Sequence, residues 1–225
     1  MPKKQKRGYL LALLINIDNE ETQIWDVYSE LLKLFKIINK NSNDYTYYEK
    51  LINIIRQKIK TGVNSIIILQ KQKQDTAKKI LEHINKHHKW LITGNNRLFI
   101  NSLEISLKEN ENIEGLIKNK EFNKILEEII ELETKELSYK LEEAINENKI
   151  YYSIIEISQI IKETNIQGYI LISEEFDIEN RNNSKYRSLI QISKNKGVKN
   201  KIIKLNSILS SRIIDLGGIV FIKIS

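Results

Sequence analysis

The chain has 225 residues, of which 41% are hydrophobic and 29% charged, and its formal net charge is +7. This length accommodates one large domain or two small ones, with enough apolar side chains for packed cores. The absence of cysteine excludes a disulfide scaffold, a cysteine nucleophile and a thiolate metal site. The longest apolar run, residues 9–15, is far shorter than the ~18 residues of a membrane span. No small-residue cleavage site follows this run, so we expect a cytoplasmic protein with no membrane partner.

The first part of the chain begins with strand patterns. Residues 9–17 are continuously apolar and predict a buried strand, and the alternating residues 22–28 predict its antiparallel partner in a hairpin. Residues 31–38 form either a third strand or a short helix, because their periodicity fits both. From Tyr47 onward, apolar residues recur at helical spacing, and this helix ends at Gly62, a natural C-terminal cap.

Strands and helices then alternate. Residues 65–69 are a short β-branched run and predict a strand, 75–88 predict a helix, and 90–93 predict another strand that ends at Gly94. This alternation predicts an α/β layer with a parallel section in its sheet. The following stretch, residues 110–147, is long, helical and acidic.

Charge is divided unevenly along the chain, and we place a domain boundary where the acidic stretch begins. The predicted domains are residues 1–124 and 125–225. Residues 1–125 hold 22 Lys and Arg against 14 Asp and Glu, whereas the remainder holds 14 against 15. This asymmetry favours a first domain that meets a polyanion. The alternative is a lysine-rich solvated surface, because lysine is abundant throughout the chain.

The second domain is more regular. Helical patterns alternate with apolar strand patterns in the order α-β-α-β-α-β, at residues 153–164, 169–172, 183–193, 201–205, 209–216 and 219–224. This order predicts a central sheet that helices cover on both faces.

Enzyme motifs are absent from the sequence. It contains no phosphate-binding loop, no dinucleotide glycine fingerprint and no serine elbow between glycines. Ser207, Ser210 and Ser211 lie close together, but no histidine is near them in sequence, so we interpret them as capping and turn hydroxyls. The carboxylates of residues 127–147 have no partner base and indicate a solvated helix face. We therefore expect no catalytic residue and no cofactor.

The three histidines are clustered. His83 and His87 are four residues apart, so both imidazoles can share one helix face and hold a metal. No glutamate follows His83 in the zinc-protease pattern, and the sequence shows no third ligand. We therefore expect solvated or partly buried histidines and no metal site.

Two lysine clusters are candidates for RNA contact. The first surrounds a strand-to-helix turn and comprises Lys71, Lys73, Lys78, Lys79, Lys86 and Lys89. Lysines near a helix N-terminus favour phosphate, so we predict that this cluster binds RNA. The second and weaker candidate is the run Lys194, Lys196, Lys199, Lys201 and Lys204. Neither cluster has interleaved aromatic residues, which favours recognition of the backbone of folded RNA over base stacking.

Two C-terminal segments resemble a known family. Residues 168–176, GYILISEEF, resemble the strand and turn of the third domain of Pelota and of the class-1 release factors of archaea and eukaryotes. Residues 216–224, LGGIVFIKI, resemble the closing strand of that domain, and residues 65–81 are similar to the middle domain of the family. The resemblance implies an α/β protein of two domains. The first would be ribonuclease-H-like, and the second an α/β/α sandwich of the ribosomal-protein-like kind.

The sequence also departs from the family. The resemblance begins at the strand over residues 9–17, so it includes no counterpart of the family's N-terminal domain. The Gly-Gly-Gln loop by which release factors hydrolyse peptidyl-tRNA is replaced by residues 38–44, which contain no glycine pair and no glutamine. Pelota itself lacks this tripeptide, so the resemblance points to Pelota. Residues 207–210 stand where Pelota proteins usually have a histidine and a Ser-Gly pair.

The resemblance implies a non-catalytic, ribosome-associated factor of archaeal type that acts in ribosome rescue, recycling or hibernation. Its expected partner is ribosomal RNA, with transfer RNA and a translational GTPase as further candidates. One alternative is an RNA-cleaving enzyme of the same fold family, for which Asp18, Asp26 and Asp44 are the candidate metal ligands or bases. Another is a protein-interaction module that docks through residues 127–147.

Overall fold

The computed structural model describes residues 10–18, 20–29, 31–40, 43–70, 75–94, 97–104, 113–163, 166–205 and 207–224, without the side chains of residues 76 and 114. These residues form two compact units that divide between Ile130 and Glu131, and residues 60–62 group with the second unit. No helix in this part of the chain is both long and apolar enough to cross a membrane.

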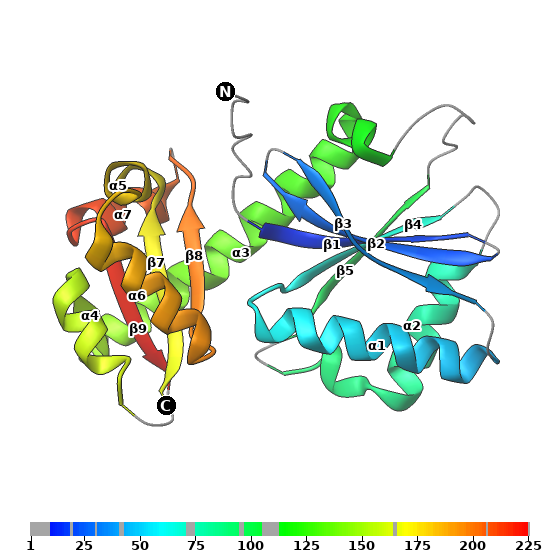
Figure 1. Ribbon diagram of the computed structural model, residues 1–225, viewed down its shortest axis with the longest axis horizontal. Helices are drawn as coiled ribbons and strands as arrows, with labels where there is room; N and C mark the ends of the chain where they lie inside the picture. Colours follow the sequence, from blue (N-terminus) through cyan, green and yellow to red (C-terminus); the bar gives the residue numbers. More distant parts are fainter. Residues whose placement is uncertain are drawn as a thin grey trace. The chain divides into compact units, whose positions relative to one another are not determined.

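The first unit is built on a five-stranded mixed sheet with the order β3-β2-β1-β4-β5. Its strands are β1 (Leu10–Ile17), β2 (Glu21–Tyr28), β3 (Leu32–Asn39), β4 (Ser65–Gln70) and β5 (Phe99–Glu104). The first three strands are antiparallel to one another, while β4 is parallel to β1 and to β5. This order and these directions are those of a ribonuclease-H-like sheet, as expected (Figure 1).

Helices cover both faces of this sheet (Figure 1). Because strand side chains alternate between faces, Leu13 and Ile15 of β1 pack with α1 (Asp44–Lys60) and α2 (Thr76–His87). Leu14 points the other way, into a core that includes Phe122 and Leu126 from the first half of α3 (Lys120–Asn146).

The structure resolves one open alternative in the first unit and contradicts one predicted strand. The ambiguous segment over residues 31–38 is strand β3. The strand predicted at residues 90–93 is wrong, because a 3-10 helix, η1 (Lys89–Leu91), continues the turn that ends α2, and its Leu91 backbone N–H donates to the carbonyl of His88 at 2.9 Å. The place beside β4 belongs instead to β5, where only Leu103 is fully buried. A second 3-10 helix, η2 (Ile113–Lys118), precedes α3.

The second unit has a four-stranded sheet with the order β6-β9-β7-β8. Its strands are β6 (Ile150–Tyr152), β7 (Gln167–Ser173), β8 (Lys199–Ile203) and β9 (Ile219–Ile224), of which β7 and β8 are parallel. One face packs against α4 (Ile154–Ile160) and α6 (Ser184–Asn195), and the other against α7 (Ile208–Asp215) and the second half of α3. This arrangement confirms the predicted α/β/α layers. Strand β6 and helix α5 (Glu174–Asn180) were not predicted.

The two segments that carry the family resemblance lie side by side in the second unit. Strand β7 from the first segment pairs antiparallel with β9 from the second. The chain turns into β9 at Gly218, whose φ is +84°, and a Cβ atom there would lie 2.6 Å from the Phe176 ring. Only glycine combines this backbone conformation with such close packing. The close contact between Gly218 and Phe176 therefore explains why one family-like segment needs a glycine where the other has a phenylalanine.

Candidate nucleic-acid interface

Helix α2 presents a lysine face to solvent. Its inward side is fixed by Ala77, Ile80 and Ile84, which are buried in the core. The helical repeat then places the opposite residues outward, so Lys78, Lys79 and Lys86 are exposed on one side of the helix. Lys89, in the turn that follows, is exposed as well. Together these four residues form what we call the α2 lysine face.

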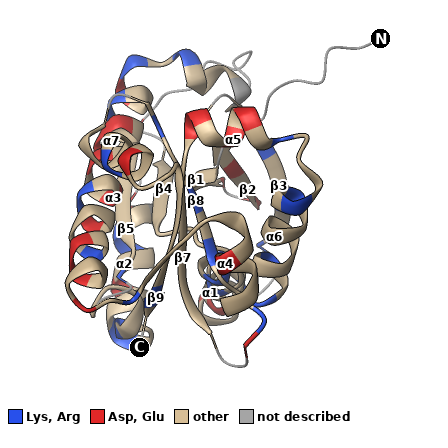
Figure 2. Cartoon of the chain, turned by 90° about the vertical axis from the view of Figure 1, so that its left-hand side faces the viewer, with Lys and Arg blue, Asp and Glu red and all other residues tan. Residues whose placement is uncertain are grey.

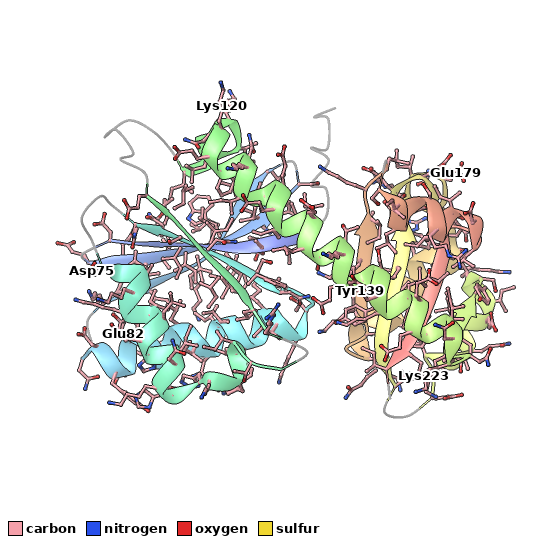
Figure 3. The ribbon with its side chains drawn as sticks, turned by 180° about the vertical axis from the view of Figure 1, so that it is seen from behind. Asp75, Glu82, Lys120, Tyr139, Glu179 and Lys223 are labelled. Carbon is pink, nitrogen blue, oxygen red and sulfur yellow. The ribbon has the colours of Figure 1, made fainter. Side chains whose placement is uncertain are left out.

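Two acidic residues reduce the charge of the α2 lysine face without neutralising it. Asp75 is the N-cap residue of α2, and Glu82 is exposed among the lysines (Figure 3). In the described part of the chain, the four lysines make no salt bridge, so their ammonium groups are available to a ligand. The other two predicted residues, Lys71 and Lys73, lie outside the described residues.

The N-terminus of α2 already has a partner for one of its free amide groups. The backbone N–H of Ala77 donates to the side-chain oxygen of Gln70 at 3.2 Å, and the Gln70 amide donates in turn to Glu104 at 2.9 Å. This acceptor competes with a phosphate for the helix end. The exposed lysines, and not the helix terminus, are therefore the main basis for anion binding.

An exposed aromatic residue adjoins the α2 lysine face. This residue was not predicted. Trp90 follows Lys89 directly, and 48% of its surface is exposed. The guanidinium carbon of Arg56, from α1, lies 5.4 Å from the centre of a Trp90 ring, within cation–π range. The sequence signal was the adjacency of Trp90 to Lys89, but the pairing with Arg56 required the fold.

The histidine cluster differs from the predicted one. His83 and His88 converge on a single carboxylate oxygen of Glu49 in α1, with their Nε2 atoms at 3.0 and 2.6 Å from it. Hydrogen bonds from His88 and His83 hold the pKa of the Glu49 carboxyl below its usual value. His87, the predicted partner of His83, is exposed and packs edge-on against Tyr45. The fold thus brings the Glu49 carboxylate to the two histidines, although no pattern in the sequence indicates this contact.

The second lysine run is used largely inside its own unit. Lys201 of β8 is buried, and its ammonium group bonds the Glu133 carboxylate of α3. The Lys199 ammonium lies 5.1 Å from the centre of the Tyr169 ring. The Lys196 ammonium donates to the backbone carbonyl of Glu163 at 3.4 Å. These contacts leave this run less able than the α2 lysine face to bind a phosphate backbone.

The candidate nuclease residues Asp18, Asp26 and Asp44 are not brought together. Asp26 is buried in β2, and its carboxylate lies 2.5 Å from the Lys58 ammonium. Asp44 begins α1. Among the His, Asp and Glu side chains of the described residues, one set of three or more lies close enough to share a metal ion. This set is Glu49, His83 and His88.

Two of the three serines near residue 210 make the capping and turn bonds that we predicted, whereas the buried hydroxyl of Ser210 has no hydrogen-bond partner among the described residues. Ser207 is the N-cap of α7, and its hydroxyl accepts the backbone N–H of Ser210 at 3.0 Å. The Ser211 hydroxyl donates to the Ser207 carbonyl. These bonds are those of a helix start and place no base beside a nucleophile.

The acidic helix α3 is partly paired within the second unit. Glu133 bonds Lys201, Glu136 bonds Lys140, and Glu142 lies 3.3 Å from the Arg212 guanidinium. Acidic residues follow this helix on its outer side (Figure 2). The prediction of a wholly solvated acidic face is therefore correct for only part of the helix.

Comparisons with known proteins bear on the fold. No family model matches the sequence, and no curated protein is significantly similar to it. Solved structures are similar, among them a ribosome-bound archaeal Pelota described together with ABCE1, with a TM-score of 0.53 and 11% identity over 99% of this chain and 63% of that one. Dom34 of S. cerevisiae, described as a translation termination-like factor, has a TM-score of 0.50 and 14% identity over 97% and 64%. Pelota of Archaeoglobus fulgidus has a TM-score of 0.42 and 14% identity over 96% and 65%.

The chain thus spans 63–65% of the length of these three proteins. The similarity extends over both units, because it includes nearly all of this chain. The protein therefore has a Pelota- and release-factor-like fold, as residues 168–176 and 216–224 indicated.

Proposed function

We propose that this chain is a non-catalytic, ribosome-associated factor that acts in ribosome rescue, recycling or hibernation by binding the backbone of ribosomal RNA. The observation that carries this proposal is the α2 lysine face on a Pelota-like fold. The archaeal Pelota of similar fold is described as ribosome-bound, which supports the ribosome as the partner.

The chemistry of the α2 lysine face suits a phosphate backbone. Lysine ammonium groups are mobile point charges that contact phosphates without reading bases. Lys78, Lys79 and Lys86 stand on a rigid helix whose opposite side is packed in the core. Each phosphate contact releases condensed counterions, so the affinity would depend steeply on salt concentration.

The test is co-sedimentation of the full chain with ribosomes at rising salt concentrations. We expect binding at low salt that weakens steeply as salt rises. Charge reversal in the triple variant Lys78→Glu, Lys79→Glu, Lys86→Glu should weaken binding at least about ten-fold and lower the salt slope by about three. Binding that is undetectable at low salt would reject the proposal.

A matched control reverses three exposed lysines on the other side of the first sheet: Lys118→Glu, Lys120→Glu and Lys124→Glu. Lys120, at the start of α3, and Glu82, on α2, mark the two sides (Figure 3). The control changes the net charge equally but should alter ribosome affinity by less than about three-fold. Equal losses in both variants would show that overall charge, and not the α2 lysine face, drives binding.

The non-catalytic part of the proposal is tested separately. The chain, incubated with ribosomes, transfer RNA and Mg²⁺, should leave the RNA intact and should not release peptide from peptidyl-tRNA. The separation of Asp18, Asp26 and Asp44 supports this expectation. RNA cleavage that is lost in an Asp18→Asn variant would instead establish the enzyme.

We propose a translational GTPase as the partner of the second unit. The yeast Dom34 of similar fold is described as interacting with Hbs1. The second unit exposes Ile178 on α5, together with Leu205 before α7 and Ile208 at the start of α7. The Leu205 backbone N–H donates to Glu174, which ties this loop to α5. An Ile178→Lys, Ile208→Lys variant should lose binding to a purified Hbs1-type GTPase but retain ribosome binding, whereas unchanged GTPase binding would refute this surface.

A further inference from the structure

We propose that Glu49, His83 and His88 form a zinc-binding site at the edge between α1 and the end of α2. Their ligand atoms, one carboxylate oxygen and two imidazole nitrogens, all lie within 4.8 Å of one another. The residues come from three places in the fold: the first half of α1, the second half of α2 and the C-cap of α2. This site goes beyond the proposed role on the ribosome and does not depend on it.

The donor set is suited to Zn²⁺. Two histidine nitrogens and one glutamate oxygen are the protein ligands of open, four-coordinate zinc sites, which leave the fourth position to water or another ligand. Imidazole nitrogen is a good ligand for zinc, whereas Mg²⁺ and Ca²⁺ prefer sites made of oxygen alone. The cluster therefore favours a transition metal over the hard cations.

The two distances to the Glu49 oxygen require only a small adjustment. Zinc–nitrogen and zinc–oxygen bonds of about 2.1 Å place two tetrahedral ligands about 3.4 Å apart. The His83 and His88 Nε2 atoms lie 3.0 and 2.6 Å from the Glu49 oxygen. The side chain of Glu49 is 27% exposed, so it can retreat by the required fraction of an ångström without disturbing the core.

The two imidazoles are held in place before any metal arrives. Their side chains are only 8% and 10% exposed. The His83 ring packs against Tyr45, Tyr48 and His87 at centroid distances of 4.9–5.4 Å. The backbone of His88 is fixed on both sides, because its N–H donates to Ile84 at 2.8 Å and its carbonyl accepts from Leu91 at 2.9 Å. Ligands on rigid elements lose little entropy on binding.

In the absence of metal, the two imidazoles share one acceptor atom. The Nε2 atoms of both rings converge on one carboxylate oxygen, so both must carry a proton in the absence of metal. A zinc ion would take the place of these two protons between the rings and the carboxylate, and each ring would then carry its proton on Nδ1. Metal binding would then join α1 to the end of α2.

The test is titration of the full chain with Zn²⁺, after dialysis against a chelator, by calorimetry and with Co²⁺ as a spectroscopic probe. We expect one metal per chain, the visible absorption of a tetrahedral Co²⁺ site and a rise in melting temperature with Zn²⁺. The variants His83→Ala and His88→Ala should weaken binding by more than about 100-fold, beyond the usual effect of losing an outer-shell group.

Two further variants keep the proposal falsifiable. Glu49→Gln changes a partly exposed side chain, so it should fold, and it should weaken Zn²⁺ binding at least about ten-fold. His87→Ala removes the neighbouring exposed histidine and should alter binding by less than about three-fold. Absence of stoichiometric binding by the unaltered chain would overturn the site. Equal losses in His87→Ala and His83→Ala would also overturn it, because the metal would then sit on the helical i, i+4 pair.

Discussion

In α2 of the first unit, Lys78, Lys79 and Lys86 extend into solvent, whereas in β8 of the second unit Lys201 is buried and bonds Glu133. Both regions have the same signature in the sequence, a run of lysines with few acids. Their difference follows from periodicity. A helix packed on one side exposes a whole face of its residues, whereas a strand directs every second residue toward a covered face of the sheet. Lys199, Lys201 and Ile203 are spaced two residues apart, so they lie on the same face of β8. Ile203 belongs to the core beneath α3.

The largest expected effect lies at the buried pair. Lys201→Ala leaves the Glu133 carboxylate, which is only 15% exposed, without its cation. Such a loss should lower the free energy of unfolding by about 3 kcal/mol, measured by urea denaturation. Lys78→Ala, on the α2 lysine face, should change the same quantity by less than about 0.5 kcal/mol.

A double variant separates the loss of the pair from the loss of packing. Lys201→Met with Glu133→Leu replaces both charges by apolar groups of similar size and should recover most of the stability. If Lys201→Ala proved as harmless as Lys78→Ala, the contrast between the two lysine clusters would be wrong.

A smaller effect is expected at another internal contact of the second unit. The Tyr186 hydroxyl donates to the buried Asp177 carboxylate at 2.8 Å, and Asp177 also accepts from Arg181. Burial, and then the bond to Asp177, raise the pKa of Tyr186 far above its ordinary value of 10.0. A raised pKa contributes stability that is present below pH 10 and is lost as the pH rises above it.

Tyr186→Phe should therefore lower the free energy of unfolding by about 1–2 kcal/mol at neutral pH. Because the variant has no phenol to ionise, its stability should fall less steeply than that of the unaltered chain between pH 10 and pH 12. Parallel pH profiles for the two proteins would contradict this account. The measurement is urea denaturation repeated across the alkaline range.

The smallest effect is expected where the second lysine run meets solvent. Lys194, Lys196 and Lys204 are exposed, so reversal of all three to glutamate should leave the fold intact. Ribosome affinity should change by less than about three-fold, compared with ten-fold or more for the α2 lysine face. A larger loss of affinity would mean that both clusters bind RNA, which would contradict the difference between the α2 lysine face and the second lysine run. The measurement is the same co-sedimentation series.

Much of the architecture was predictable because it depends on local patterns. The apolar run in β1, the alternation in β2 and the helical spacing in α1 each identified an element correctly. Strand β5 was missed, because its sequence FINSLE mixes polar and apolar residues and only Leu103 is fully buried. A partly exposed strand of this kind has no clear hydrophobic periodicity.

In the candidate sites too, features that depend on local spacing were predictable and features that depend on tertiary contact were not. The lysines of α2 were identified as a candidate because their spacing in a helix already gathers Lys78, Lys79 and Lys86. The placement of His83 and His87 on one helix face was also predictable, but the contact with Glu49 was not, because Glu49 is 34 residues from His83 in the sequence. Its carboxylate reaches the imidazoles only after α1 and α2 have packed on the same face of the sheet.

By itself, the sequence determined the order of most strands and helices, the outward lysines of α2 and the two segments that resemble Pelota. Periodicity and local propensity act over a few residues, so these features are readable along the chain. The tertiary structure alone decided which charges are buried and which carboxylate joins which histidine. Such pairs form between elements whose contact depends on sheet order and helix packing, and no local pattern encodes that contact.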